Sequence, residues 1–271
     1  MYSHLYAFLH VLFCLPHISL ITFITIINID LNITWKHIAF AYFIMFRVPC
    51  VGIAMSACLH RYFAHNAFKT TRTLEIVIAL LSCCTYQGGC LWWASKHRKH
   101  HTFCDQEKDP HSATRKGTIY AWLLWQYFEC YIDWDFVPTN FVTYPLLIIN
   151  IFMPLILLSM CSIINYFYGI EWAIFGLWIP ALLSGIASSR FNVDYHPPKT
   201  QKQCKAIDSG FGGAENLPEF IKLPIAFVFT PLVGESYHEH HHKYPNALCR
   251  PGIDLPFYLF LLPLKNMNFI W

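Results

Sequence analysis

Long apolar stretches alternate with short polar ones along most of this chain. A helix needs about 20 mostly apolar residues to cross a bilayer, and four stretches meet that length: residues 5–29, 37–59, 140–165 and 170–189. A turn at Tyr168-Gly169 separates the last two. The pattern predicts an all-α integral membrane protein with four transmembrane helices, in one domain that covers residues 1–271.

A fifth apolar stretch, residues 73–94, carries Glu75 near its start and Gln87 in its second half. The basic residues decide how it lies. Seventeen of the 19 Lys and Arg residues fall between positions 61 and 116 or after 189, and basic loops stay on the cytoplasmic side. If residues 73–94 crossed the bilayer, two basic segments would lie on opposite sides. We therefore expect an interfacial helix here, with the polar regions and both termini cytoplasmic.

Composition supports a membrane location. The chain is 55% hydrophobic and 13% charged, whereas soluble domains are about 25% charged. The first apolar stretch is long and follows no basic segment, which is typical of an anchor rather than a cleaved signal. The 11 cysteines form no C-x-x-C pair, and an odd number inside apolar stretches favours reduced thiols. The polar parts are then expected to face a reducing compartment.

The 15 histidines are unusual for this length, and several of them form four groups on the predicted cytoplasmic side. Two groups, HRKHH and HEHHH, contain H-x-x-H-H, which aims three imidazoles from one face of a helix. In a third, NVDYH, Asn192 and His196 also share a face. In the fourth, HRYFAH, the five-residue spacing suits a helix end. The candidate metal ligands are His60, His65, His97, His100, His101, His196, His238, His241 and His242.

Nine imidazoles exceed what one ion needs, because zinc takes four ligands and catalytic zinc takes three. They suit two ions that each keep an open position. Imidazole binds Zn, Cu, Fe and Ni alike, so the ligand type alone leaves the metal open. A metal transporter would hold its ligands near mid-membrane, whereas these histidines follow the ends of apolar segments.

HEHHH also fits H-E-x-x-H, the zinc protease motif, with His238 and His242 as ligands and Glu239 as base. Such a site needs a third ligand, usually downstream on a helix. Tyr244-Pro245 would break that helix, no histidine follows His242, and the only later acid is Asp254. An intramembrane zinc protease is therefore a remote alternative that leaves seven histidines without a role.

At this point the motifs resemble those of the membrane fatty-acid desaturases, in particular the acyl-CoA (stearoyl-CoA type, delta-9-like) branch. Four segments carry the resemblance, in the same order and with similar spacing over about residues 40–271: HRYFAHNAFKTTR, WWASKHRKHHTFCDQEKDPH, NVDYH and GESYHEHHHKYP. Two positions depart from the pattern. Glu239 stands where Asn is usual, and Asn66 stands where a basic residue is common.

The resemblance implies four transmembrane helices, an interfacial helix and a cytoplasmic histidine-rich cap. It implies two irons held by the nine histidines, with Asn192 acting through a water. The implied reaction uses O₂ and two electrons to insert a cis double bond into a saturated acyl chain, most simply an acyl-CoA. A histidine-box hydroxylase, or an oxidase of sphingoid or alkyl chains, is the main alternative.

The resemblance also implies partners and a location. Electrons would come from a separate donor, such as a small b-type cytochrome with its reductase or a ferredoxin. No nucleic-acid partner is expected. The implied location is the endoplasmic reticulum membrane, or the inner membrane of a bacterium.

Substrate contacts follow from the resemblance with less detail. Counting back from His60 to where the substrate tail would end suggests Ile44 and Val48 as chain-length gates, although lipid-facing or packing roles suit them as well. Trp93 and Lys96 are candidates for contacts with the head group, and Lys69 and Arg72 are candidates for contacts with an acidic phosphate. Either pair could instead anchor a helix at the lipid surface.

Overall fold

The computed structural model describes residues 2–13, 31–196, 203–204, 206–208 and 232–271. These residues form helices joined by turns, and the described part of the chain contains no β-strand beyond three isolated bridges. The all-α prediction is therefore confirmed.

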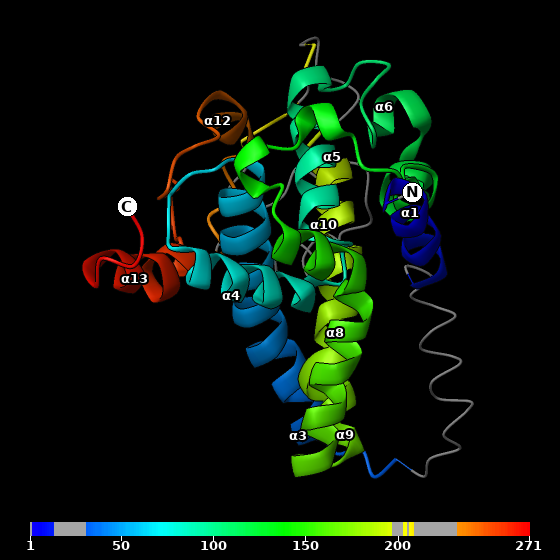
Figure 1. Cartoon of the computed structure of the whole chain (residues 1–271), viewed down its shortest axis with the longest axis vertical. Coiled ribbons are helices and arrows are strands. Elements are labelled where there is room, and N and C mark those ends of the chain that lie inside the picture. The colour runs from blue at the N-terminus through cyan, green and yellow to red at the C-terminus, as the bar shows by residue number, and fades with distance from the viewer. Residues whose placement is uncertain (1, 14–30, 197–202, 205, 209–231) are drawn as a thin grey trace.

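Three continuous helical runs lie along the long axis of the molecule (Figure 1). Each is long and apolar enough to cross a membrane. The first joins α3 and η1, the second is α8, and the third joins α9, η6 and α10. Their bounds are Trp35–Ala39 and Phe40–Ala64; Tyr144–Tyr168; and Ile170–Ala173, Ile174–Trp178 and Ile179–Asp194.

These runs match the predicted spans 37–59, 140–165 and 170–189. The first and third extend further than the apolar pattern indicated, whereas α8 has nearly the predicted length and lies three to four residues later in the chain. Gly169 makes the predicted turn between the last two, because its φ of +93° suits a residue without a Cβ. Of the predicted first span, residues 5–29, only the start is described, in α1 (Tyr2–Phe13). The remainder lies outside the described residues, so the count of four spans stays a prediction.

The predicted interfacial helix over residues 73–94 is wrong as a single helix. The structure has α4 (Arg72–Ser82) with η2 (Cys83–Thr85), then a break, then α5 (Cys90–Phe103) at 76° to the first part. In Figure 1, α4 lies across the long axis whereas α5 runs along it.

The break has local causes in the sequence. Tyr86 and Gly88 have φ of 52° and +83°, a conformation that stops a right-handed helix. Gly89 packs so closely on Asn150 that a Cβ would lie 2.2 Å from the Asn150 Oδ1. That Oδ1 accepts hydrogen bonds from the backbone N–H groups of Leu91 and Trp92. Asn150, on α8, therefore caps α5 from another helix.

The remaining helices are short and gather mostly around the end of the molecule to which α5 points (Figure 1). They include α12, which carries HEHHH. Their bounds, in chain order, are α6 (Ala113–Lys116), η3 (Tyr120–Leu124), α7 (Trp125–Phe128), η4 (Trp134–Phe136), η5 (Thr139–Phe141), α12 (His238–Lys243), η7 (Phe257–Leu261) and α13 (Leu262–Asn266).

Two buried ion pairs hold the C-terminal segment, one to the end of η1 and one within the segment itself. Arg61 forms two hydrogen bonds of 2.8 Å with the Asp254 carboxylate, and both side chains are fully buried. Arg250 contacts Glu235 at 3.4 Å. Gly234 packs on the Arg61–Asp254 pair with φ of +72°, and a Cβ there would come within 2.8 Å of Asp254. These contacts fix the position of α12 relative to η1.

The prediction that all cysteines are reduced is wrong for two of them. Cys104, at the end of α5, forms a disulfide with Cys204. The apolar pattern could not reveal this pair, because the two residues are 100 positions apart and meet only when the chain folds. Eight other cysteines in the described residues are free, and Cys249 is the exposed one among them.

Candidate metal centre

The structure brings all nine predicted histidine ligands together at one end of the helices, in two groups. We name them cluster A and cluster B. Within each group the nearest ring nitrogens all lie within 4.8 Å of one another. Cluster A consists of His60, His65, His97, His101 and His241; cluster B consists of His100, His196, His238 and His242.

Each H-x-x-H-H motif contributes to both clusters. In α5, His97 and His101 (i, i+4) point into cluster A, while His100 belongs to cluster B. In α12 the assignment is reversed: His238 and His242 belong to cluster B, and His241 belongs to cluster A. The two helices therefore interlock across the pair of clusters. Each motif gives two histidines to one cluster and one to the other.

The five-residue spacing of His60 and His65 is accommodated by the backbone at the end of η1. The His65 N–H donates to the His60 carbonyl at 3.1 Å, an i→i+5 bond of the π type. Such a wider turn places residues five apart on the same side. The two ring centroids are consequently 4.9 Å apart.

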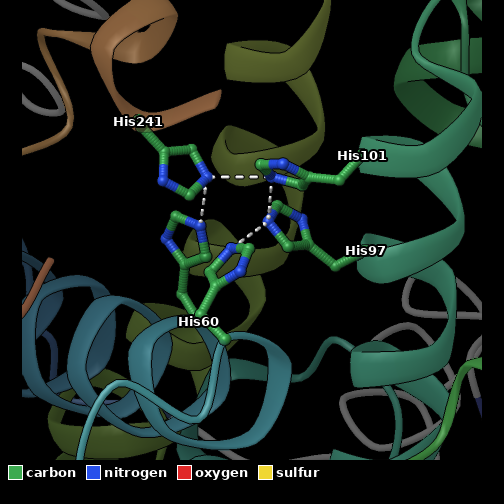
Figure 2. Close-up of side chains that lie close together, drawn as sticks. His60, His97, His101 and His241 are labelled. Atoms are coloured by element: carbon green, nitrogen blue, oxygen red, sulfur yellow. Dashed lines mark hydrogen bonds between the residues drawn. The ribbon is translucent and has the colours of Figure 1, made fainter. Parts of the chain in front are cut away.

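The Nε2 atoms of cluster A converge on one another (Figure 2). His241 Nε2 lies 2.9 Å from the Nε2 atoms of both His60 and His101. His97 Nε2 lies 3.0 Å from those of His101 and His65. In cluster B, His238 Nε2 lies 3.0 Å from His196 Nε2 and 3.2 Å from His242 Nε2.

Three carboxylates hold the outer ring nitrogens of three of these histidines. The Nδ1 atoms of His60, His100 and His196 lie 3.1, 2.9 and 2.9 Å from Glu235, Asp109 and Asp105. An Nδ1–H donated to a carboxylate leaves the Nε2 lone pair facing inward, which is the usual support of a metal-binding histidine. Buried Nε2 of His100 has no hydrogen-bond partner among the described residues.

The electrostatics suit neutral imidazoles. Burial lowers the pKa values of His238, His241 and His242 well below the ordinary value, so these rings stay unprotonated and can bind a metal. Burial raises the pKa of Asp109, but the adjacent His100 and His111 outweigh this and keep the pKa below its usual range. The residues present therefore fit two metal ions, one in each cluster.

A pocket adjoins the clusters and is lined by His60, His97 and His238 together with apolar side chains. Trp93 stacks on His97 with 4.8 Å between the ring centroids. Its Nε1 donates to Gln87 Oε1 at 3.2 Å, and the Gln87 amide donates to Ser188 at 3.1 Å. The lining also includes Met55, Trp125, Phe191 and Asn192. Half-buried Asn192, predicted to act through a water, thus faces the same space.

The other predicted substrate residues lie elsewhere. Ile44 is 53% exposed and Val48 is half-buried on the same helix, and neither lines the described pocket. Lys96 is buried between Glu129 and Asp133. Exposed Lys69 and Arg72 lie at the start of α4, where the Arg72 guanidinium pairs with Glu75. Substrate contacts by these residues stay predictions. The ion pairs with Glu129 and Asp133 are enough to explain why Lys96 is buried.

Sequence reasoning did not assign roles to the supporting carboxylates or to Gln87 and Ser188. A signal was present for the carboxylates, because Asp105 and Asp109 come four and eight residues after HRKHH and Glu235 precedes HEHHH by three residues. His240 lies outside both clusters. Its ring packs on Tyr244, and Glu239 pairs with Lys243 at 3.2 Å.

Comparisons with known proteins place these features in context. No protein-family model matches the chain. A hex-5-enoyl-[acyl-carrier protein] acetylenase from Moorena producens (strain JHB) is 35% identical over 246 residues, which cover 81% of this chain and 72% of that protein. The sn-2 palmitoyl-lipid 9-desaturase of Nostoc sp. (strain 36) is 25% identical over 81% of this chain and 74% of its own length. An acyl-CoA Delta(11) desaturase of Trichoplusia ni is 35% identical over 34% of this chain and 25% of its own.

Proposed function

Because this chain belongs to the membrane fatty-acid desaturase family and is an oxidoreductase, we propose that it is a diiron enzyme that inserts a cis double bond into a saturated acyl chain. The observation that carries this proposal is the partition of nine histidines into two clusters beside one pocket. Overall, a –CH₂–CH₂– unit, O₂, two electrons and two protons give –CH=CH– and two waters.

Bound iron would supply the activation of O₂ and the removal of two hydrogens. The five histidines of cluster A and the four of cluster B, with Asn192 through a water, would hold the two ions. Glu235, Asp105 and Asp109 orient His60, His196 and His100 and fix the tautomer that leaves each Nε2 free.

The pocket residues position the acyl chain and exclude water. Trp93, Trp125, Phe191 and Met55 give the pocket a mainly apolar wall that suits methylene groups. The hydrogen bonds from Trp93 to Gln87 and from Gln87 to Ser188 fix the Trp93 ring beside His97. A chain held against that ring lies next to both clusters.

We propose an acyl thioester as substrate, with acyl-CoA as the first carrier to test. Acyl carrier protein is the second candidate, because the Moorena relative, which aligns along 81% of this chain, is named for a substrate on that carrier. Electrons would come from a separate donor, a small b-type cytochrome with its reductase or a ferredoxin. The site would face the cytoplasm, from the endoplasmic reticulum or from a bacterial inner membrane.

A lipid profile tests the proposal. Cells of a host that lacks the corresponding desaturase would produce the chain or its His241→Ala variant, and fatty acids would be analysed by gas chromatography with mass spectrometry. We expect new cis monoenes only with the unaltered chain and only in air. Purified protein supplied with acyl-CoA or acyl carrier protein thioesters would then identify the carrier.

Other products would count against the proposal. Hydroxylated chains in place of monoenes would mean that the same metal centre performs the hydroxylase reaction. An unchanged profile, with iron-loaded protein in the membrane and thioesters of both carriers left unreacted, would contradict the proposed function.

A further inference from the structure

The two histidine clusters have supporting carboxylates with different electrostatic surroundings. Behind cluster B, the Asp109 carboxylate accepts from His100 Nδ1 at 2.9 Å and from the backbone N–H groups of Asp105 and His111 at 2.8 and 3.0 Å. The His111 ring lies 3.9 Å away. These partners are backbone amides and imidazoles, so the negative charge of Asp109 is not offset by a contacting lysine or arginine among the described residues.

Cluster A has the opposite arrangement. Glu235 accepts from His60 Nδ1 at 3.1 Å and from Ser56 at 2.7 Å through one carboxylate oxygen. Its other oxygen meets the Arg250 guanidinium at 3.4 Å, and both side chains are buried. Buried Nε and Nη2 of Arg250 have no hydrogen-bond partner among the described residues. Neighbouring Arg61 and Asp254 neutralise each other, so the buried charge behind His60 sums to zero.

The two clusters also differ in whether their histidines line a cleft. His65 and His101 of cluster A line a cleft that is also lined by Arg98 of α5, by residues 135–139 and by residues 245–246 after α12. The half-buried Arg98 guanidinium has a buried Nε without a hydrogen-bond partner among the described residues. No ligand of cluster B lines this cleft.

These charges act on the metals through the ligand rings. A carboxylate on Nδ1 makes an imidazole more basic and stabilises the more highly charged metal ion. A guanidinium on that carboxylate weakens the effect, and it opposes added positive charge directly because buried charges are poorly screened. Asp109 acts on His100 without this opposition, whereas Glu235 acts on His60 against Arg250.

We propose that Arg250, Glu235 and Asp109 make the two metal positions electrostatically unequal, so that cluster A favours the reduced ion and cluster B favours the oxidised ion. This rests on the proposed diiron function. With iron, each step is Fe³⁺ plus one electron giving Fe²⁺, and the electron comes from the separate donor. Cluster A is reduced first, and it is also the cluster that borders the cleft.

A redox titration of the iron-loaded full chain in detergent tests this inequality. The chain, labelled with ⁵⁷Fe, would be reduced stepwise with dithionite and mediators and followed by Mössbauer and electron paramagnetic resonance spectroscopy. We expect two one-electron steps with a mixed-valence state between them. Arg250→Gln should lower the upper midpoint, and Asp109→Asn should raise the lower one. Each change is expected to reach about tenfold in the ratio of reduced to oxidised iron at fixed potential, or 59 mV.

Two control variants distinguish an effect of charge from a general disturbance of the structure. Arg250→Lys keeps the positive charge, so its upper midpoint potential should stay close to that of the unaltered chain. Lys265→Gln removes an exposed charge on α13 and should change neither midpoint potential. If Arg250→Gln does not hold iron, the titration of Asp109→Asn tests whether the two metal positions are unequal. A single two-electron step, or equal shifts of both midpoints, would overturn the inequality even in a protein that desaturates. A chain that binds no iron would overturn the proposed function as well.

Discussion

At the scale of residues, the choice among four neighbouring histidines in HEHHH follows from helical geometry. His238, His241 and His242 lie on the face of α12 that meets the clusters, whereas His240 packs on Tyr244. The glutamate that suggested a protease, Glu239, pairs with Lys243 instead. Neighbouring positions in this motif therefore have different surroundings.

His241→Ala should abolish product formation, because it removes the ring whose Nε2 contacts those of His60 and His101. The loss should be at least about a hundredfold, the upper end of the effect of losing a supporting residue. His240→Ala should keep most of the activity. Product would be measured by gas chromatography in membranes that contain equal amounts of each variant. Equal losses in both variants would show that the ligand register in α12 is wrong.

Asp105→Asn should weaken iron binding about 10- to 100-fold, because the carboxylate that orients His196 would lose its charge. Ser112→Ala is the matched control, since it removes a 2.8 Å hydrogen bond to Asp105 but leaves the carboxylate charged. Competition with a chelator of known affinity would give both values. Similar affinities in the two variants would contradict the role of Asp105.

The gathering of the nine histidines at one site could be predicted from sequence, but not their partition between the two clusters. The spacing i, i+3, i+4 already places His97, His100 and His101 on one face. Which of them joins His241 depends on how α12 docks on α5. In the structure α12 meets α5 through contacts such as that between His241 and His101, which lie 140 positions apart in the chain. Local spacing contains no information about such distant contacts.

At the scale of elements, the break at residues 86–89 explains how one apolar stretch supplies both a helix across the molecular axis and the helix that carries HRKHH. Hydropathy alone indicated one helix over 73–94, because residues on both sides of the break are apolar. The positive φ of Gly88 and the Asn150 cap on α5 instead divide this stretch into two helices. Gln87, inside the break, is thereby placed in the pocket beside Trp93.

Asp254→Ala should lower the free energy of unfolding by about 3–5 kcal/mol, because it leaves the buried Arg61 charge without its partner. Glu239→Gln removes a partly exposed ion pair with Lys243 and should change this free energy by no more than about 1 kcal/mol. Thermal unfolding of both variants in the same detergent would compare them. Equal midpoints would mean that the buried pair does not hold the C-terminal segment.

At the scale of the whole molecule, α12 and both ends of the chain lie toward one end of the long helices, and α9, which begins directly after Gly169, lies at the other (Figure 1). The turn at residues 166–169 contains no Lys or Arg. The positive-inside rule then predicts that the cluster end is cytoplasmic. Whether residues 14–30 complete a fourth span lies outside the described residues.

Thiol labelling of intact vesicles would test this orientation. Exposed Cys249 follows α12, so a membrane-impermeant maleimide should label it from the cytoplasmic side. A Cys249→Ser, Tyr168→Cys variant should be labelled only after the membrane is permeabilised. Labelling of both positions from the same side would exclude the predicted arrangement of the helices.

The central claim is that nine histidines hold two irons in each chain. Elemental analysis of purified protein, with the protein quantified by amino-acid analysis, tests it most directly. We predict two irons per chain in the unaltered protein, and loss of iron in His241→Ala but not in His240→Ala. One zinc per chain without iron would contradict the claim.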